Sequence, residues 1–192
     1  MALEYEWKFR AEEAVLFDID AAFSGQRNEI AMETTYYDTP SGALSALRYT
    51  LRRRFENGVS VCTLKAPAGN ARGEWETECD RIEDAVPQLV ALGCPQNLPE
   101  LIEEGLIPIC GAKFIRIAKA IILPDAEVEL ALDKGKLLGG NREESLCEVE
   151  VELKSGSNDA CDHFAAALAV RFDLKPEPRS KFRRALTLYK GE

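Results

Sequence analysis

Charged and large apolar residues alternate at the very start of the chain. The segment Glu4-Tyr5-Glu6-Trp7-Lys8-Phe9 has a charged residue at every even position and a large ring-bearing residue at every odd one. A period of two is typical of a β-strand that packs one face and leaves the other in polar surroundings. The polar face of this predicted strand carries two carboxylates and an ammonium group. That combination of charges is unusual for a strand that merely faces solvent.

The same alternation recurs in later segments, which we also interpret as strands. Each would place charged side chains on one face and mostly apolar side chains on the other, because successive residues of a strand point to opposite sides of the sheet. The charged faces of these segments comprise Arg52 and Arg54; Arg72, Glu74, Glu76 and Glu78; Glu127, Glu129 and Asp133; Glu148, Glu150, Glu152 and Lys154; and Lys181 and Arg183.

The complete pattern predicts a mainly β protein with a few helices. Apolar residues at helical spacing and capping residues predict helices over 11–23, 82–92, 98–104 and 158–172. Extended segments are predicted over 4–9, 28–38, 47–55, 59–65, 72–79, 112–122, 126–133, 146–154 and 181–189. Asn57-Gly58 is a strong hairpin signal between two of them. We expect an α+β fold, an antiparallel β-barrel with helices packed outside, as a single domain over residues 1–192.

The charged faces could point to solvent or into the barrel. In the first arrangement they would form ordinary cross-strand ion pairs. The acidic segments 127–129 and 148–152 lie on successive strands, however, and successive strands usually pair. Like charges opposite one another destabilise a sheet unless cations neutralise them. We therefore favour an interior lined by the charged faces, with the apolar faces turned outward beneath the helices.

Composition narrows the classes of function. The net charge of −9 argues against general binding of nucleic acids or membranes, but not against a small anion held in a locally basic cleft. Six cysteines without a C-x-x-C pair, and His163 as the single histidine, argue against zinc. Neither a signal peptide nor an apolar run of the roughly 20 residues that span a bilayer is visible. We expect a cytoplasmic protein.

The residue types on the charged faces suit a phosphate ligand together with a metal ion. Arginine binds phosphate oxygens through a planar fork, and lysine binds them as a point charge. Clustered carboxylates without cysteine or histidine suit a hard cation such as Mg²⁺ or Mn²⁺. The sequence has no G-x-x-x-x-G-K-[ST] phosphate loop, so side chains would have to hold the phosphates.

An ordered series of motifs resembles the CYTH domain of the triphosphate tunnel metalloenzyme superfamily. The series consists of Glu4-x-Glu6-x-Lys8, Tyr36-Tyr37-Asp38-Thr39-Pro40, Leu51-Arg52-x-Arg54, Thr63-Leu64-Lys65, Glu74-Trp75-Glu76, Glu127-x-Glu129 through Leu132-Asp133, Cys147-Glu148-x-Glu150-x-Glu152-Leu153 and Ser180-Lys181-Phe182. Segment 127–154 is similar to bacterial inorganic triphosphatases in particular. Those enzymes often carry a helical CHAD domain, and we expect this chain to be of the type without one.

The resemblance implies an eight-stranded antiparallel β-barrel tunnel and assigns roles to matching residues. The implied metal ligands are Glu4, Glu6, Glu148 and Glu150. The implied triphosphate-binding residues are Lys8, Arg52, Arg54, Lys65, Arg116, Asp133, Lys181 and Arg183. Glu6, Glu150 and Lys8 would take part in catalysis. Lys113 competes with Arg116 for one position, and Arg184 competes with Arg183 for another.

The function implied by the resemblance is hydrolysis of inorganic triphosphate (tripolyphosphate) to diphosphate and phosphate with Mg²⁺ or Mn²⁺. The alternatives are a thiamine triphosphatase or nucleoside triphosphatase, a class IV adenylyl cyclase, and a non-catalytic polyphosphate-binding module. The sequence leaves open whether one or two metal ions bind and which group activates water. We expect a small-molecule triphosphate as partner, with no nucleic acid and no membrane, and a homodimer is possible in this family.

Overall fold

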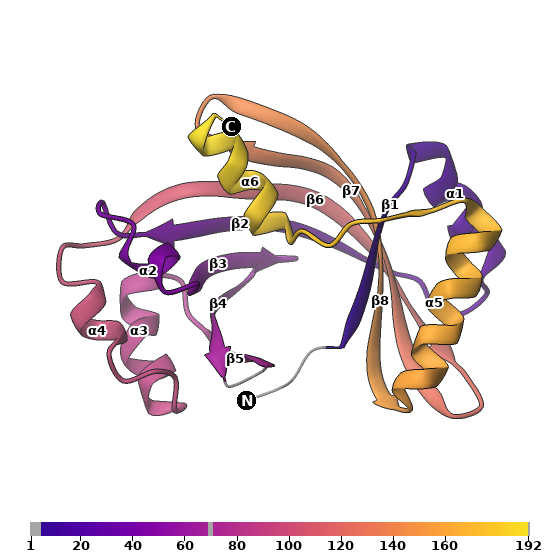
Figure 1. Cartoon of the computed structure of the whole chain (residues 1–192), viewed down its shortest axis with the longest axis horizontal. Helices are drawn as coiled ribbons and strands as arrows, with labels where there is room; N and C mark the ends of the chain where they lie inside the picture. The colour runs from indigo at the N-terminus through magenta and orange to yellow at the C-terminus, as the bar shows by residue number, and fades with distance from the viewer. Residues whose placement is uncertain (1–4, 69–70, 192) are drawn as a thin grey trace.

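A single antiparallel sheet dominates the computed structural model, which describes residues 5–68 and 71–191. Its nine strands have the order β5-β4-β3-β2-β6-β7-β8-β1-β9. Their bounds are β1 Glu6–Arg10, β2 Asn28–Asp38, β3 Thr50–Glu56, β4 Val59–Ala68, β5 Ala71–Glu78, β6 Ile107–Ile122, β7 Ala126–Gly139, β8 Arg142–Gly156 and β9 Lys175–Pro176. The sheet is strongly curved, with β3–β5 on one side of the arch and β1 and β8 on the other (Figure 1).

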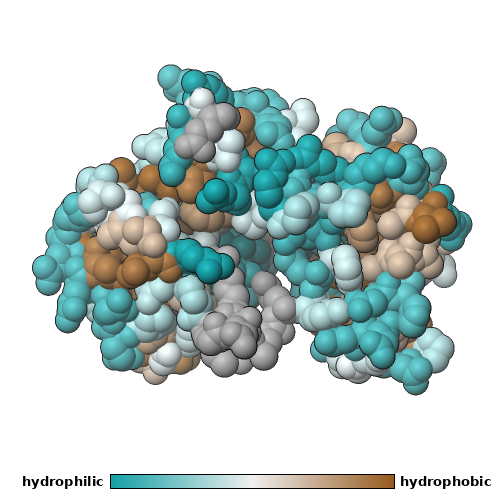
Figure 2. Space-filling model, viewed as in Figure 1, coloured by the Kyte–Doolittle hydropathy of each residue, from teal (hydrophilic) through white to brown (hydrophobic). Residues whose placement is uncertain are grey.

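The arch is an open tunnel rather than a closed barrel. Across the described ranges, the edge strands β5 and β9 pair with β4 and β1, and not with each other. The prediction of a mainly antiparallel β fold with helices outside is confirmed, but the eight long strands do not close into a ring. A hollow surrounded largely by hydrophilic side chains lies between the two ends of the sheet (Figure 2).

Most of the helices cover the outer face of the sheet at its two ends, whereas the C-terminal helix packs on the inner face. Their bounds are α1 Glu13–Ala22, α2 Ala43–Ala46, α3 Ile82–Ala91, α4 Leu98–Leu101, α5 Asn158–Phe172 and α6 Lys181–Lys190. The helices α1 and α5 lie at one end, and α3 and α4 lie at the other (Figure 1). None of the helices in the described ranges combines the length and the apolar composition that a membrane crossing requires.

Two apolar clusters beneath these helices show which strand faces point outward. One cluster joins Leu130 and Val149 of the sheet to Ile19 and Leu168 of α1 and α5. The other packs Leu64 and Trp75 against α3. Because neighbouring residues of a strand alternate in direction, the charged residues between these apolar positions must point into the hollow. The prediction that the apolar strand faces point outward and the charged faces point inward is confirmed.

The prediction of a strand over 181–189 is wrong, because this segment forms the helix α6. Ser180 caps its N-terminus by accepting a hydrogen bond from the backbone N–H of Arg183 (3.2 Å). Ala185 and Leu186 are buried on one helical face, against Met32, Phe114 and other residues of the inner sheet face. The alternation of Lys181, Phe182 and Arg183 was too short to distinguish a strand from a helix.

The helix α6 lies close against the sheet on the side of the hollow. A Cβ atom on Gly139 of β7 would lie only 2.4 Å from the backbone nitrogen of Tyr189 and 2.6 Å from the carbonyl oxygen of Ala185. Only glycine allows the backbone of the helix to approach the strand this closely. This contact fixes the position of α6 on the sheet, and with it the position of the basic side chains in the first turn of the helix.

Candidate functional site

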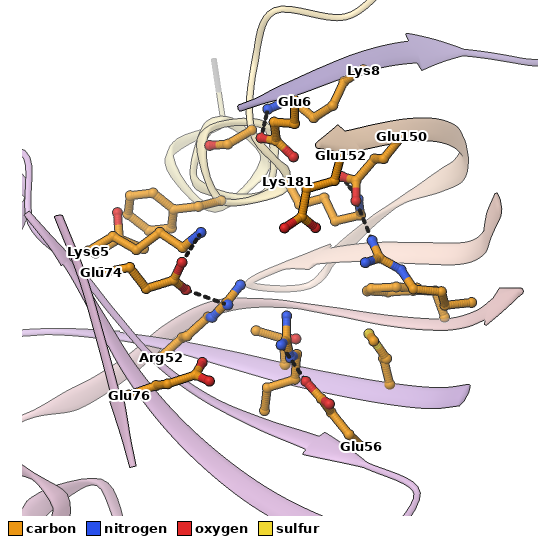
Figure 3. A pocket seen from close by; sticks show the side chains of 18 of the residues that line it. Glu6, Lys8, Arg52, Glu56, Lys65, Glu74, Glu76, Glu150, Glu152 and Lys181 are labelled. Atoms are coloured by element: carbon orange, nitrogen blue, oxygen red, sulfur yellow. Dashed lines mark hydrogen bonds and ion pairs between the residues drawn. The ribbon is translucent and has the colours of Figure 1, made fainter. Parts of the chain in front are cut away.

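The charged faces of the strands meet in a cavity of about 530 Å³ inside the arch (Figure 3). Its charged lining residues are Glu6, Lys8, Arg52, Arg54, Glu56, Lys65, Glu74, Glu76, Arg116, Glu129, Glu150, Glu152, Lys154 and Lys181. They come from strands at both ends of the sheet and from the first turn of α6. Such a set of opposite charges can hold an anion and a cation together.

One wall of the cavity, called the basic wall below, presents Arg52, Arg54 and Lys65 beside the carboxylates of Glu56, Glu74 and Glu76. Arg52 and Lys65 both contact Glu74, at 3.4 Å and 3.3 Å, and Arg54 pairs with Glu56. Burial, and then the positive charge of Arg52, lower the pKa of the Arg54 guanidinium. Within the described residues, the buried Nε atoms of Arg52 and Arg54 have no hydrogen-bond partner. These donors are therefore suited to an additional anionic ligand.

The opposite wall is formed by β1 and β8, whose register places one like-charge pair and one opposite-charge pair side by side. Glu6 pairs in register with Glu152, and Lys8 pairs with Glu150. The Lys8 ammonium donates to Glu6 at 2.7 Å, and Lys154 contacts Glu152 at 3.0 Å. Burial acts to lower the pKa of Lys8, but Glu6 outweighs it and raises that pKa. Lys8 therefore stays charged beside the carboxylates.

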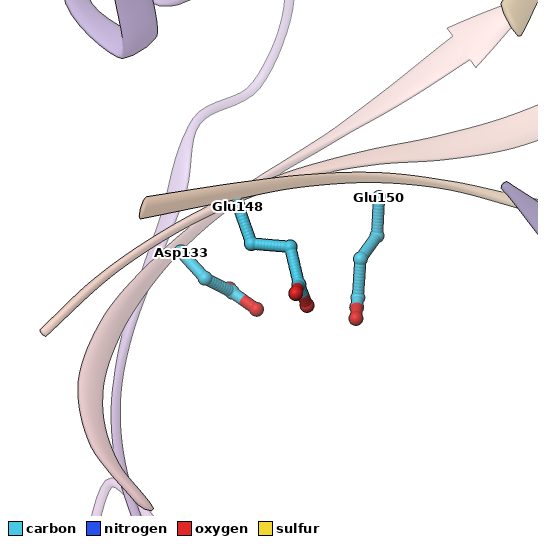
Figure 4. Close-up of side chains that lie close together, drawn as sticks. All are labelled: Asp133, Glu148 and Glu150. Carbon is cyan, nitrogen blue, oxygen red and sulfur yellow. The ribbon is translucent and has the colours of Figure 1, made fainter. Parts of the chain in front are cut away.

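A buried carboxylate cluster lies behind this wall. The Asp133, Glu148 and Glu150 carboxylates each offer an oxygen within 4.8 Å of the other two (Figure 4). The Lys181 ammonium donates to Glu150 at 2.7 Å and also to Glu148, and it forms an ion pair with Asp133 at 2.8 Å. An ammonium from α6 thus binds at the centre of the cluster.

Two arginines complete the charge balance of this carboxylate cluster. Arg116 donates twice to Asp133, at 2.7 Å each, and also contacts Glu150. Arg184 donates to Glu148 at 3.0 Å and to Glu144 at 2.8 Å. Asp133 and Glu148 are fully buried. The three carboxylates of the cluster therefore contact three cations, one of which also pairs with Glu144.

These contacts shift the pKa values of the buried groups in opposite directions. Burial acts to raise the pKa of Glu150, but Lys181 and Arg116 hold it well below its usual range. Burial raises the pKa of Glu148 to about 7. Burial opposes the charge of Lys181, but Asp133 and the two glutamates raise the pKa of its ammonium. Glu150 is therefore an ionised carboxylate at the edge of the cavity.

The carboxylates differ in how well they could hold a metal ion. All of them offer the oxygen ligands that Mg²⁺ and Mn²⁺ prefer. Asp133 and Glu148 already surround the Lys181 ammonium, so a metal ion there would have to displace it. Glu6 and Glu152 face the cavity and contact only a lysine each among the described residues. The donor set therefore fits a hard cation best on the cavity side of β1 and β8.

Most of the predicted site residues come together in this cavity. Glu6, Lys8, Arg52, Arg54, Lys65, Arg116, Glu150 and Lys181 line it. Asp133 and Glu148 lie directly behind it, in contact with Lys181. Glu4 lies outside the described residues.

The structure also decides between the competing basic residues. Arg116 faces the cavity, whereas Lys113 is exposed and pairs with Glu33 elsewhere. Arg184, and not Arg183, contacts the buried carboxylate Glu148. Arg183 lines a second cavity and does not line the first. The prediction that Arg183 faces the first cavity is therefore wrong. In a helix, the residue that shares a face with Lys181 is Arg184, three positions further along the chain.

Several residues of the cavity were not among the predicted site residues. These are chiefly Glu56, Glu74, Glu76, Glu129, Glu152 and Lys154. The alternation of 72–79 and 147–154 already placed most of them on the charged faces. The signal was therefore present, and Glu152 in particular follows from its position opposite Glu6.

Comparisons with known proteins agree with this architecture. The family model described as CYTH domain matches residues 2–186. The chain is 28% identical over 166 residues to an inorganic triphosphatase of Haemophilus influenzae, an alignment that covers 85% of this chain and 47% of the relative. The chain therefore spans about half the length of the curated relative it matches.

Solved structures share the fold at low sequence identity. A Hippeastrum protein, HpAC1, described as a putative adenylyl cyclase with a dominant triphosphatase activity, has a TM-score of 0.66 at 16% identity, covering 98% of this chain and 96% of that one. A putative adenylate cyclase of Bacillus halodurans has a TM-score of 0.61 at 15% identity, covering 93% and 94%. The PH1819 protein of Pyrococcus horikoshii has a TM-score of 0.59 at 20% identity, covering 96% and 99%.

Proposed function

Because this chain belongs to the CYTH domain family, we propose that it is a metal-dependent triphosphatase that converts inorganic triphosphate to diphosphate and phosphate. The observation that carries the proposal is the convergence of Arg52, Arg54 and Lys65 with Glu6 and Glu150 on one cavity. The basic residues suit the phosphates, and the acidic residues suit a divalent cation. The inorganic triphosphatase of Haemophilus influenzae supports the choice of substrate.

The basic wall is the proposed binding surface for the phosphate chain. Arg52 and Arg54 project from one strand, and the Lys65 ammonium reaches the same Glu74 carboxylate as Arg52. Entry of a polyanion would exchange these contacts with carboxylates for stronger charge-assisted bonds to phosphate. Lys8 adds a positive charge from the opposite wall. The cavity can therefore grip a triphosphate from two sides.

The proposed metal ligands are Glu6, Glu150 and Glu152, with Glu4 retained from the sequence-based set. Glu148 is not proposed as a ligand, because its carboxylate already pairs with Lys181 and Arg184. When bound, Mg²⁺ or Mn²⁺ supplies positive charge that stabilises negative charge developing on the phosphoryl oxygens. Lys181 keeps Asp133 and Glu148 neutralised behind the wall. We assign Lys181 mainly to this role, because its ammonium contacts three carboxylates.

The chemical step would be an in-line displacement at a terminal phosphorus atom. A bond forms from the water oxygen to phosphorus, and the bond from phosphorus to the bridging oxygen breaks. Glu150 is ionised and can orient the water by accepting a hydrogen bond from it. Arg52, Arg54 and Lys65 would stabilise the diphosphate as it leaves with the electron pair. The proton of the water passes to a carboxylate and then to solvent.

A substrate panel tests the proposal. Tripolyphosphate, thiamine triphosphate and ATP are each supplied with Mg²⁺ or Mn²⁺, and orthophosphate, diphosphate and cyclic AMP are measured. We expect metal-dependent release of orthophosphate from tripolyphosphate at the highest kcat/KM. Cyclic AMP from ATP would instead identify a cyclase, and binding without any product would identify a polyphosphate-binding module. Either result would overturn the proposal.

A further inference from the structure

Three basic side chains differ from the others in having no partner. Nearly all lysine and arginine side chains that the structure describes contact a carboxylate, a carbonyl oxygen or an aromatic ring. The exceptions in those ranges are Arg48, Arg183 and Lys190. All three line one second cavity, of about 620 Å³. All three residues are exposed, and they gather around one cavity in a chain with a net charge of −9.

The second cavity adjoins the first. It lies between the segment that contains α2 and the helix α6. Thr50, Ser180 and Phe182 line both cavities. The second cavity is thus separated from the triphosphate site by no more than the first turn of α6 and the start of β3.

A carboxylate that lines the second cavity does not neutralise its bases. Asp38 accepts hydrogen bonds from the backbone N–H groups of Thr39 (2.8 Å), Leu44 (2.9 Å) and Ser45 (3.1 Å). It is buried and holds the turn into α2 together. The cavity therefore keeps an excess of positive charge, which focuses an attractive field for anions.

The backbone of Arg48 is a second, independent observation. Its φ angle of 61° lies in the left-handed region, which glycine adopts easily and arginine rarely does. Strained backbone positions of this kind cluster at ligand-binding and active sites, which points to a use for the Arg48 side chain. Here the side chain lines the second cavity and has no internal partner that could account for it.

We propose that Arg48, Arg183 and Lys190 form a second phosphate-binding site next to the first. The ligand chemistry is that of a phosphate anion, which each of these side chains binds well. The phosphate has two possible sources: the further groups of a linear polyphosphate whose end occupies the first cavity, or a separate orthophosphate ion. Only this choice of ligand rests on the proposed function, because the unpartnered bases are a property of the structure itself.

The test is a calorimetric titration without divalent metal, so that binding is measured whether or not the chain hydrolyses its ligand. Orthophosphate, tripolyphosphate and a defined linear polyphosphate longer than three phosphates are each titrated into the wild type and into two variants. Arg48→Gly removes a charge at a backbone position that glycine favours, so its melting temperature should not fall. Arg183→Ala removes a second charge from an exposed position. Arg81→Ala, in an exposed ion pair elsewhere, is the control.

We expect each variant to weaken binding of the longer polyphosphate by about tenfold, with tripolyphosphate changed less than about twofold and the control unchanged. Loss of orthophosphate binding in both variants would support the same site with a separate ion as its ligand. Equal affinity of wild type and variants for all three anions would overturn the proposal. Failure of the proposed function would give a different result. In that case Lys65→Ala would bind tripolyphosphate with the same affinity as the wild type.

Discussion

The Lys181 ammonium lies 2.8 Å from the Oδ2 atom of Asp133, although one residue begins α6 and the other lies deep in β7. The same ammonium contacts Glu148 and Glu150. It occupies the centre of a carboxylate cluster that could otherwise attract a divalent cation. The contact therefore both fastens α6 to the inner face of the sheet and directs metal binding toward Glu6 and Glu152.

The first prediction concerns the stability that Lys181 provides. Lys181→Met keeps the length of the side chain but leaves the buried carboxylates Asp133 and Glu148 short of one cation. Removing one partner of a buried ionic group costs about 3–5 kcal/mol. We expect a loss of this size in the free energy of unfolding, measured with urea at pH 7. The control Lys175→Met, in an exposed pair with Asp173, should change it by less than about 0.5 kcal/mol. Equal stability of both variants would contradict the structural role of Lys181.

The second prediction is a pH dependence that arises at Glu177. This buried carboxylate accepts hydrogen bonds from Arg179 and contacts Arg10. Burial acts to raise its pKa, but the arginines outweigh burial and lower that pKa to about 2. A carboxylate whose pKa is lower in the folded state stabilises the fold above its unfolded pKa, and this stabilisation disappears as the pH falls through the folded value.

Comparison of the wild type with Glu177→Gln measures this effect. The variant should be less stable at pH 7, by at most about 3 kcal/mol, and the difference should shrink between pH 4.5 and pH 2. The measurement is denaturant unfolding of both proteins across that range. A difference that stays constant with pH would show that the ionised form of Glu177 is not what stabilises the fold.

The third prediction tests Glu6 as a metal ligand. Glu6→Gln keeps the shape of the side chain and the hydrogen-bond acceptor for Lys8, but it removes the negative charge. We expect phosphate release from tripolyphosphate to fall by at least about a hundredfold, and more Mg²⁺ or Mn²⁺ to be needed for the remaining activity. Glu33→Gln, which alters an exposed carboxylate beside Lys113, is the matched control. An unchanged metal requirement in Glu6→Gln would remove Glu6 from the proposed ligand set.

The fourth prediction separates substrate binding from chemistry at Lys65. Lys65→Ala removes one cation from the basic wall and leaves the carboxylates of β1 and β8 in place. KM for tripolyphosphate should rise by about tenfold, whereas kcat should change less. The reason is that Lys65 contacts the substrate in both the ground state and the transition state, so its loss weakens binding more than it raises the barrier from the bound substrate. Lys113→Ala, outside the cavity, should leave both constants unchanged. Steady-state kinetics with saturating metal distinguishes these results.

Much of this site could be predicted from the sequence because strand periodicity fixes the direction of each side chain. The alternation around Glu6, Glu150 and Arg52 was enough to predict that these residues share an interior. It could not predict that the first strand pairs with β8, on which the position of Lys8 opposite Glu150 depends. Nor could it show that the edge strands stay apart, because closure depends on the curvature of the sheet.

The C-terminal segment shows where periodicity fails. Residues 181–183 alternate like a strand, but Ala185 and Leu186 bury one face of a helix against the sheet. The wrong element led to the wrong residue, since a strand pairs Lys181 with Arg183 on one face and a helix pairs it with Arg184. Tertiary packing of α6, rather than local preference, decides this choice.

Crystal structures with tripolyphosphate and Mn²⁺ test the central claim most directly. One structure is of the wild type and the other is of Glu6→Gln, which should hydrolyse the ligand slowly. We predict phosphate density between Arg52 and Lys65 in the cavity, and an anomalous manganese peak next to Glu6 and Glu152 in the wild type, weakened in the variant. Lys181 should remain in contact with Asp133. Phosphate density confined to the outer surface, or manganese in the place of the Lys181 ammonium, would contradict the account.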